Sequence, residues 1–145
     1  MKCKEMMTAD PVCCTPNDSA ADIAQLMKAQ DIGSVPICTD GQSKKLLGIV
    51  TDRDLALKVV AEGRDPNTTT AQSVMTENPV TCRPEDNVET ALEAMEQHQV
   101  RRVPVVDKNG HLVGIIAQAD VAIRCGEPEK TAEVVEEISR PGLAA

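Results

Sequence analysis

The sequence predicts a mixed α/β (α+β) fold made of two copies of one small unit, and the main observation is an internal repeat. The stretch from Met7 to Val12 returns as Met75 to Val80, a shift of 75 − 7 = 68 positions. Farther along, Gly48 to Val50 matches Gly114 to Ile116, a shift of 114 − 48 = 66 positions. Apolar runs follow in the same order in both copies, so each copy is expected to form a β-α-β-β-α unit.

The elements of the first copy follow from its apolar runs and its turn residues. We expect a strand over 12–15, a helix over 20–27, strands over 34–38 and 46–50, and a helix over 54–60. Ser19, with Asp22 three positions later, resembles a capping box at the start of the first helix. Gly63 follows the second helix and can adopt the left-handed conformation that often ends a helix.

The second copy repeats this order, with Asp86 and Asn87 as expected helix caps. We expect a strand over 80–82, a helix over 88–95, strands over 102–106 and 112–116, a helix over 120–123, a short helical turn over 71–75 and a terminal helix over 129–139. Pro36 and Pro104 lie inside apolar runs, and proline cannot donate to a β-ladder. Each proline therefore marks a sheet edge or the start of pairing.

The repeat also predicts the domain organisation. Residues 1–66 are expected to form the first unit with an N-terminal segment, residues 67–126 the second unit with a linker turn, and residues 127–145 a C-terminal helix and tail. A small sheet with helices on one side leaves its other face apolar. We therefore expect the two units to pack through their sheets by pseudo-twofold symmetry.

Composition and charge exclude several classes of function. The chain has 145 residues, a formal net charge of −8 and no Phe, Tyr or Trp. A negative chain without a basic run is a poor partner for nucleic-acid phosphates, and it offers no aromatic ring on which a base could stack. No apolar run reaches the roughly 20 residues that span a bilayer, and the N-terminus lacks an apolar signal core. We expect a cytoplasmic protein without membrane insertion.

The sequence nominates neither a metal site nor catalytic residues. The six cysteines are at positions 3, 13, 14, 38, 82 and 125, without a Cys-x-x-Cys pair, so most are expected to be reduced, small apolar residues. His98 and His111 are the only histidines, and neither lies in a nucleophile motif. We therefore expect no catalytic cofactor and no enzyme activity.

The sharpest local pattern is the junction where an apolar strand ends at Thr51 and a helix follows at once. Thr51 and Asp54 lie one helical turn apart, a spacing that favours a capping box and that also fits a hydroxyl and a carboxylate that hold a ribose. The second copy keeps the carboxylate as Asp120 but has Ala117 in place of the threonine. Asp120 is therefore not explained by such a box, although it can favour the helix dipole.

Arg101 and Arg102 precede the second middle strand, where the first copy has Gly33 and Ser34. The planar guanidinium group donates two parallel hydrogen bonds and is suited to phosphate. A solvated surface pair is the alternative interpretation. If both copies carry a site, the first has the hydroxyl and the second has the arginines.

These residues together resemble those of a known family. The repeated unit resembles the cystathionine β-synthase (CBS) domain, and the chain resembles a tandem CBS pair, or Bateman module, from about Cys3 to Cys125. The resemblance is carried by Met-Thr-x-x-Pro-Val at the start of each copy, by Val35-Pro36-Ile37 and Val103-Pro104-Val105-Val106, and by the Gly-x-x-Thr-x-x-Asp motif that ends at Asp54.

The resemblance implies a regulatory module that binds an adenosine compound in clefts between its two units. The ligand would be AMP, ADP, ATP, S-adenosylmethionine or a dinucleotide. In that family the aspartate of the motif holds the ribose hydroxyls, the threonine contacts ribose or phosphate, and the segment around the middle proline meets base and phosphate. The implied ligand-binding residues are Ser34, Val35, Pro36, Thr51, Asp54, Arg101, Arg102, Val103, Pro104 and Asp120.

The resemblance also implies a homodimer, a flat disc of four units that often regulates an enzyme or a channel. The chain contains no recognisable effector domain, so its output would pass through an effector protein in trans, through dimerisation or through the terminal helix. A structural CBS pair that has lost its ligand is the alternative, and a small enzyme is less favoured.

Overall fold

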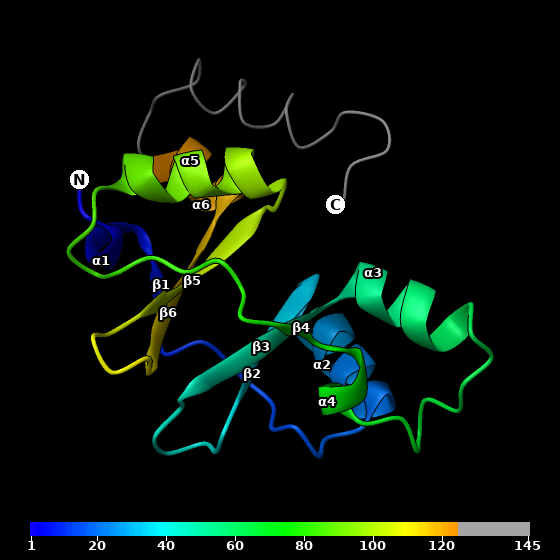
Figure 1. Cartoon of the computed structure of the whole chain (residues 1–145). Helices are drawn as coiled ribbons and strands as arrows, with labels where there is room; N and C mark the ends of the chain where they lie inside the picture. Colours follow the sequence, from blue (N-terminus) through cyan, green and yellow to red (C-terminus); the bar gives the residue numbers. More distant parts are fainter. Residues whose placement is uncertain (125–145) are drawn as a thin grey trace. The chain divides into compact units, whose positions relative to one another are not determined.

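The computed structural model describes residues 1–124 and divides the chain into two compact units, each described here by itself. The first-repeat unit is Val12–Pro79, and the second-repeat unit joins Met1–Pro11 to the chain from Val80 onward. Each unit has a three-stranded antiparallel sheet with helices, so the protein has the predicted mixed α/β fold (Figure 1). The helix predicted over 129–139 lies outside the described residues.

Each sheet is completed by a strand from the beginning of the other sequence repeat. In the first-repeat unit the order is β2 (Ser34–Cys38), β3 (Leu46–Thr51), β4 (Thr76–Glu77). In the second-repeat unit the order is β1 (Thr8–Ala9), β6 (Leu112–Ala117), β5 (Arg102–Val106). The compact units therefore exchange their leading segments, and their boundaries differ from the sequence boundary predicted at residue 66.

The strands predicted over 12–15 and 80–82 are wrong. These segments make only isolated parallel bridges, Cys14 to Ile37 and Cys82 to Val105. The chain turns before them because Asp10 and Asn78 adopt positive φ values of 50° and 49°. Asp and Asn tolerate this left-handed region better than most residues, and the proline that follows each of them cannot continue a ladder.

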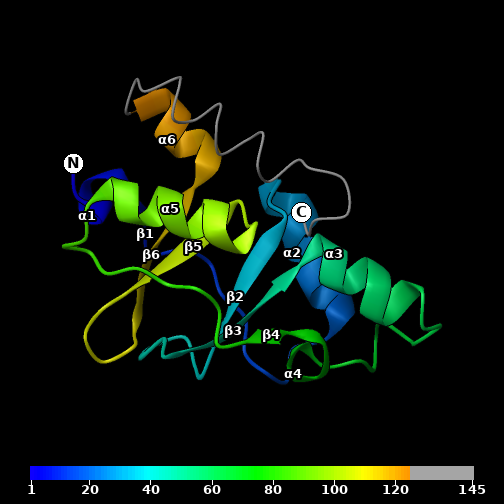
Figure 2. The same ribbon diagram turned by 45° about the horizontal axis from the view of Figure 1, so that its top comes forward.

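Apart from α1, which was not predicted, the helices follow the predicted order along the chain, and Figure 2 shows α5 and α6 beside β5 and β6. They are α1 (Cys3–Met6), α2 (Ala20–Gln30), α3 (Asp52–Leu55) continued by the π-helix η1 (Ala56–Val60), α4 (Ala71–Val74), α5 (Val88–His98) and α6 (Gln118–Arg124). The Ser19 hydroxyl accepts a hydrogen bond from the Asp22 N–H at 3.1 Å, as the capping pattern predicts. Gly63 has a φ of 65° just after η1, also as predicted.

The prediction that Asp86 and Asn87 cap α5 is confirmed only for the position of Asn87. Asn87 is the N-cap residue but makes no side-chain hydrogen bond there. The Asp86 carboxylate instead accepts the Arg83 N–H at 2.8 Å, just as the Asp18 carboxylate accepts the Thr15 N–H at 2.8 Å. Both aspartates therefore stabilise the turn before the helix instead of its first turn.

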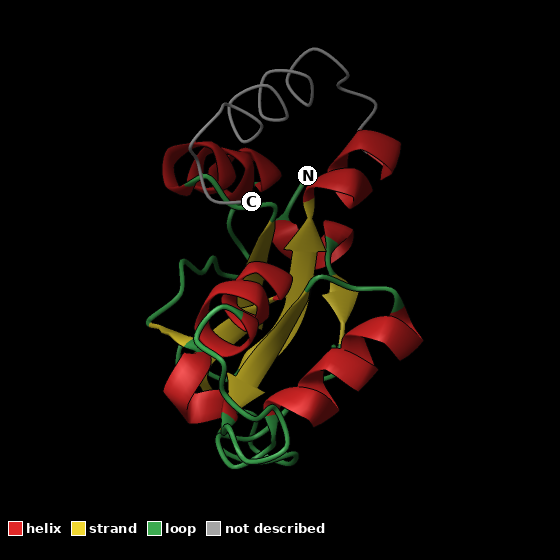
Figure 3. Ribbon diagram, turned by 90° about the vertical axis from the view of Figure 1, so that its right-hand side faces the viewer, coloured by secondary structure: helices red, strands yellow, loops and turns green. Residues whose placement is uncertain are grey.

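Each unit has its own core of aliphatic and sulfur-containing side chains, where the helices and strands of Figure 3 meet. Ile23, Val35 and Val50 are fully buried in the first-repeat unit, as are Leu92 and Val103 in the second-repeat unit. The middle prolines lie in β2 and β5, which are edge strands, as predicted. No helix in the described part of the chain is long and apolar enough to cross a bilayer.

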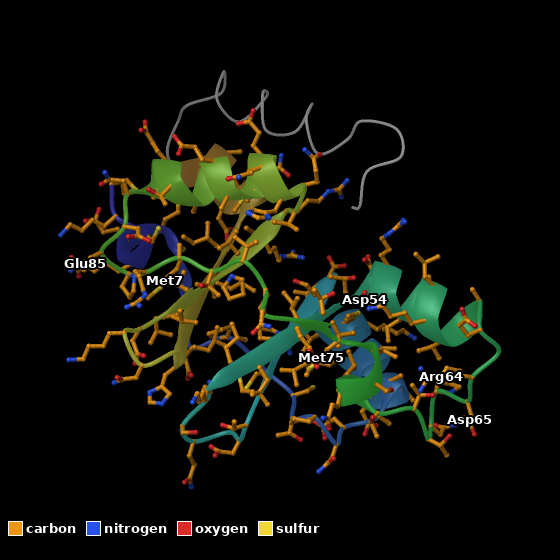
Figure 4. All side chains as sticks on the ribbon, in the orientation of Figure 1. Met7, Asp54, Arg64, Asp65, Met75 and Glu85 are labelled. Atoms are coloured by element: carbon orange, nitrogen blue, oxygen red, sulfur yellow. The ribbon has the colours of Figure 1, made fainter. Side chains whose placement is uncertain are left out.

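Two glycines let the exchanged strands approach. A Cβ atom at Gly48 would lie 2.7 Å from the Thr76 carbonyl oxygen and 2.8 Å from the Met75 sulfur. A Cβ atom at Gly114 would collide with the Met7 side chain, whose Cγ would lie 2.7 Å away. Figure 4 labels both methionines, each next to the strand that carries its glycine. The absence of a side chain at Gly48 and Gly114 thus allows neighbouring parts of the same unit to pack closely.

We predict that Gly48→Ala lowers the free energy of unfolding by about 1–3 kcal/mol, because the new methyl group would displace β4. Gly41→Ala is the matched control, because a Cβ atom there meets nothing within 4 Å. Urea unfolding of both variants checks this. Equal stabilities of the two variants would contradict the packing role of Gly48.

Candidate functional site

The first-repeat unit brings Thr51 and Asp54 together where β3 passes directly into α3 (Figure 4). The Asp54 N–H donates to the Thr51 hydroxyl at 3.0 Å, and the Thr51 N–H donates to the Asp54 Oδ2 atom at 2.9 Å. The capping box that the sequence suggested is therefore complete. Both side chains have a structural role at this helix start, whatever else they bind.

A lysine that the sequence analysis did not single out contacts the same carboxylate. The Lys58 Nζ atom lies 3.1 Å from the Asp54 Oδ1 atom and donates to the Val74 carbonyl at 3.0 Å. The Asp54 side chain keeps only 12% of its exposure, so the ion pair is partly shielded from solvent. The sequence could have indicated this ion pair, because Asp54 and Lys58 are four residues apart and residues with that spacing lie on one face of a helix.

Ser34 lies opposite Thr51 in the β2–β3 pairing and keeps 7% of its exposure. Its hydroxyl has no hydrogen-bond partner among the described residues. An unpaired buried hydroxyl costs roughly 1–3 kcal/mol, so a group that bonds it would be favoured. The sequence placed Ser34 near Thr51 but gave no sign that its hydroxyl is buried and unpaired.

The remaining predicted residues of β2 contribute differently. The Val35 side chain is fully buried in the core of its unit, and the Pro36 carbonyl accepts the Cys14 N–H at 3.0 Å. In β5, Val103 is fully buried and the Pro104 carbonyl accepts the Cys82 N–H at 3.1 Å. The two valine side chains are therefore part of the cores, and the two proline carbonyl groups already accept hydrogen bonds from the backbone.

The second-repeat unit forms the equivalent junction without a capping box. Arg102 pairs with Ala117 at the end of β6, and the Gln118 N–H donates to the Arg101 carbonyl at 2.9 Å. The Asp52 N–H donates to the Gly33 carbonyl at the same distance in the first-repeat unit. The two junctions therefore share one backbone arrangement.

Polar groups at this second junction have unused bonding capacity. Within the described residues, the half-buried Asp120 carboxylate makes no hydrogen bond or ion pair, and neither do the guanidinium groups of Arg101 and Arg102. The buried Gln118 Nε2 atom also has no partner there. Gln118 was missed, although its position in the repeat, equivalent to Asp52 at 118 − 52 = 66, could have identified it.

The two junctions differ in charge. The first-repeat junction carries the carboxylates of Asp52 and Asp54, the guanidinium group of Arg53 and the Lys58 ammonium group that pairs with Asp54, so its charges balance. The second-repeat junction carries two guanidinium groups, from Arg101 and Arg102, with the Asp120 carboxylate. An anionic group is therefore favoured more at the second-repeat junction, where two guanidinium groups accompany one carboxylate.

The described residues contain no cluster of three or more His, Cys, Asp or Glu side chains that could hold a metal ion. His98 is exposed, and His111 lies beside Asp107, with 3.5 Å between its Nδ1 atom and the nearest carboxylate oxygen. Hydrogen bonds from the backbone N–H groups of His111 and Asn109 hold the pKa of Asp107 below its usual value. These contacts stabilise a hairpin turn.

Comparison with known proteins identifies the family. The model of the CBS domain matches residues 3–61 and 71–125. The chain is 36% identical to the CBS domain-containing protein YhcV of Bacillus subtilis over 140 residues, which covers 97% of this chain and 96% of that protein. It is also 39% identical to hypoxic response protein 1 of Mycobacterium tuberculosis over 119 residues, which covers 82% of this chain and 81% of the relative.

Solved structures agree with this match. A crystal structure of hypoxic response protein I with two coordinated zinc ions is 37% identical, with a TM-score of 0.78, and the match covers 86% of this chain and 98% of that chain. The CBS domain protein PAE2072 of Pyrobaculum aerophilum, complexed with AMP, is 26% identical, with a TM-score of 0.80 and coverage of 91% and 98%.

We predict that Thr51→Ala lowers the free energy of unfolding by about 1 kcal/mol and leaves the fold intact, because it removes only the cap hydroxyl. The natural Ala117 at the equivalent position supports this expectation. Thr51→Ser keeps the hydroxyl and should restore most of the loss. Chemical unfolding of the two variants tests the cap. A serine variant as unstable as the alanine variant would refute it.

Proposed function

The chain belongs to the CBS domain family and carries two copies of the domain, and we propose that it is a non-catalytic sensor of adenosine nucleotides. The main support is that Asp54 and Asp120 lie at equivalent strand-to-helix junctions and that both retain acceptor capacity. The AMP complex of its relative PAE2072 supports the choice of ligand class.

The bonding capacity of the two carboxylates suits a ribose diol. An ionised carboxylate has about four lone-pair sites. At Asp54 the Thr51 N–H and the Lys58 ammonium group occupy two of these sites, which leaves two for the two ribose hydroxyls. Asp120 has no partner within the described residues, so its full capacity is available. Ribose binding at Asp54 would therefore not require the capping box of α3 to break.

We propose that the two junctions prefer different ligands. The second-repeat junction would bind a phosphorylated adenosine such as AMP, ADP or ATP, because Arg101 and Arg102 have unpaired donors there. The first-repeat junction has Gly33 and Ser34 where the second has Arg101 and Arg102, and it would favour an adenosine ligand that does not place a phosphate at that position. The buried Ser34 hydroxyl would gain its missing hydrogen bond from such a ligand.

Ligand binding would act by shifting the population of conformations of the pair. We propose that the protein is a homodimer and that the shift reaches an effector protein in trans. Leu57, Val60 and Ile123 lie on the helices that follow the two junctions and keep 48%, 77% and 81% of their exposure. Exposed apolar side chains of this size are suited to a protein interface.

A structural CBS pair without a ligand is the second candidate. The complete capping box gives Thr51 and Asp54 a sufficient role in stability, and that observation favours this candidate. Thermal unfolding with AMP, ATP and S-adenosylmethionine separates the two proposals. A ligand at a hundredfold excess over its Kd stabilises the folded state by about 2.7 kcal/mol. An unchanged Tm with every compound would favour the structural role.

We predict that Asp120→Ala lowers the affinity for AMP by roughly 10- to 100-fold and leaves the fold intact, because hydrogen bonds to a charged group contribute about 1.5–3 kcal/mol. Asp54→Ala should weaken binding at the other junction and also reduce stability through the lost cap. Isothermal titration calorimetry measures both effects. Asp52→Ala is the matched control, because it removes an exposed carboxylate from the start of α3, the helix that carries Asp54. If the Asp120 and Asp52 variants bind AMP equally well, the ribose role of Asp120 is wrong.

We predict that Arg102→Ala weakens AMP binding by about tenfold or more and changes adenosine binding little, because only AMP carries the phosphate that the guanidinium group would contact. Titration of the wild type and the variant with both compounds checks this. An equal loss of affinity for AMP and adenosine would assign Arg102 a role in shaping the site and would remove its phosphate role.

A further inference from the structure

Lys58 connects two parts of the first-repeat unit that are distant in the sequence. Its ammonium group lies 3.1 Å from the Asp54 Oδ1 atom at the start of α3 and donates to the Val74 carbonyl at 3.0 Å. Val74 is the last residue of α4, and β4 begins two residues later at Thr76. Figure 4 labels Asp54 and Met75, the residue between α4 and β4. One side chain thus links the carboxylate of the candidate site to the strand that completes the sheet.

Lys58 completes the bonding of both acceptors. The last carbonyl groups of a helix have no partner within that helix, and Val74 is fully buried, so the lysine supplies a donor that solvent does not. At Asp54 the Thr51 N–H occupies the Oδ2 atom and Lys58 occupies the Oδ1 atom. The carboxylate is therefore held from both sides, and its remaining acceptor sites keep a fixed direction. A group held in its binding geometry loses less entropy when a ligand arrives.

The backbone around Lys58 departs from a regular α-helix. η1 is a π-helix, and the Ala61 N–H donates to the Ala56 carbonyl, five residues back, at 2.9 Å. Such short π-helical turns are rare and occur frequently at functional sites. An ordinary α-helix already brings residues four apart together, so the ion pair with Asp54 does not by itself explain this turn. The turn is a second, independent sign that the position of Lys58 matters for more than a surface ion pair.

The second repeat has a basic residue at the same spacing. Position 58 corresponds to Arg124, at 58 + 66 = 124, so a basic residue follows each aspartate by four positions. The second repeat lacks the threonine of the capping box, because Ala117 stands there. The aspartate and the basic residue thus occur together both with the box and without it. The basic residue is therefore associated with the aspartate itself and not with the capping of the helix.

We infer that Lys58 is a positioning residue for ligand binding at the first-repeat junction. It fixes the Asp54 carboxylate for the ribose hydroxyls and couples the bound ligand to β4 through the Val74 carbonyl; this inference rests on the proposed function. A ribose that restricts the carboxylate also restricts the lysine bonded to it, so the end of α4 and β4 open less often. β4 leads into the second repeat, so occupancy of the first junction would change the stability of the segment that connects the repeats.

The test uses adenosine as the probe and the Asp120→Ala variant as the parent, so that binding at the first-repeat junction is measured by itself. Lys58→Met removes both contacts and keeps a long unbranched side chain. We expect isothermal titration calorimetry to show that adenosine binds roughly three- to tenfold more weakly than to the parent, because an orienting hydrogen bond to a charged group is lost. Lys58→Arg keeps the positive charge and should restore most of the affinity.

Lys28→Met is the matched control, because Lys28 is an exposed lysine of α2 in the same unit. It should bind adenosine as tightly as the parent does. Lys58→Gln, which keeps a donor for the Val74 carbonyl, takes the place of Lys58→Met if the methionine variant does not fold.

Amide hydrogen exchange followed by NMR measures the coupling to β4. Saturating adenosine should slow exchange at residues 74–77 in the parent and leave it unchanged in the Lys58→Met variant. A purely structural ion pair would not give this difference, because a loss of stability speeds exchange equally with and without ligand.

The outcomes separate this inference from the proposed function. Adenosine that binds to Lys58→Met as tightly as to the parent, or more tightly, would overturn the inference and leave the sensor proposal standing. Exchange at residues 74–77 that responds to saturating adenosine in the same way in both proteins would also overturn it. Failure of the wild type to bind any adenosine compound would instead contradict the proposed function, and the inference with it.

Discussion

The close approach of β4 to β3 and of β1 to β6, at Gly48 and Gly114, is the contact on which the rest of the structure depends. A Cβ atom at Gly48 would lie 2.7 Å from the Thr76 carbonyl oxygen of β4, and a Cβ atom at Gly114 would collide with the Met7 side chain just before β1. Each sheet therefore obtains its third strand from the beginning of the other repeat. A chain cut at the repeat boundary would separate β4 from its partner β3 and β1 from its partner β6. Both repeats are thus needed to complete each three-stranded sheet.

The same strands also organise the candidate site. β3 and β6 contain the glycines, and each runs directly into a helix whose first turn carries the aspartate. At one junction a hydroxyl caps the helix and a lysine pairs with the carboxylate. At the other an alanine replaces the hydroxyl, and the nearby polar groups have no partners within the described chain. Under the proposed function, the first junction would combine a stabilising role with ligand binding, and the second would bind ligand without a capping box. This difference is the physical reason to expect different ligands.

Much of the fold could be predicted from the sequence because it depends on local patterns. The strands over 34–38 and 102–106 were predicted with the same bounds, and the box at Thr51 and Asp54 was recognised from its spacing. The third strands could not be predicted, because β1 and β4 are only two residues long and pair with strands that are distant in the sequence. The hydrogen bond from Lys58 to the Val74 carbonyl and the unpaired Ser34 hydroxyl depend on tertiary packing, which no local pattern reports.

A crystal structure of the protein grown with saturating AMP tests most directly whether the helix-start aspartates hold the nucleotide. It should contain AMP with its ribose hydroxyls within hydrogen-bond distance of the Asp120 carboxylate and its phosphate beside Arg102. Crystals in which AMP lies away from both Asp120 and Asp54, or in which no AMP is bound at saturation, would contradict the proposed sensor.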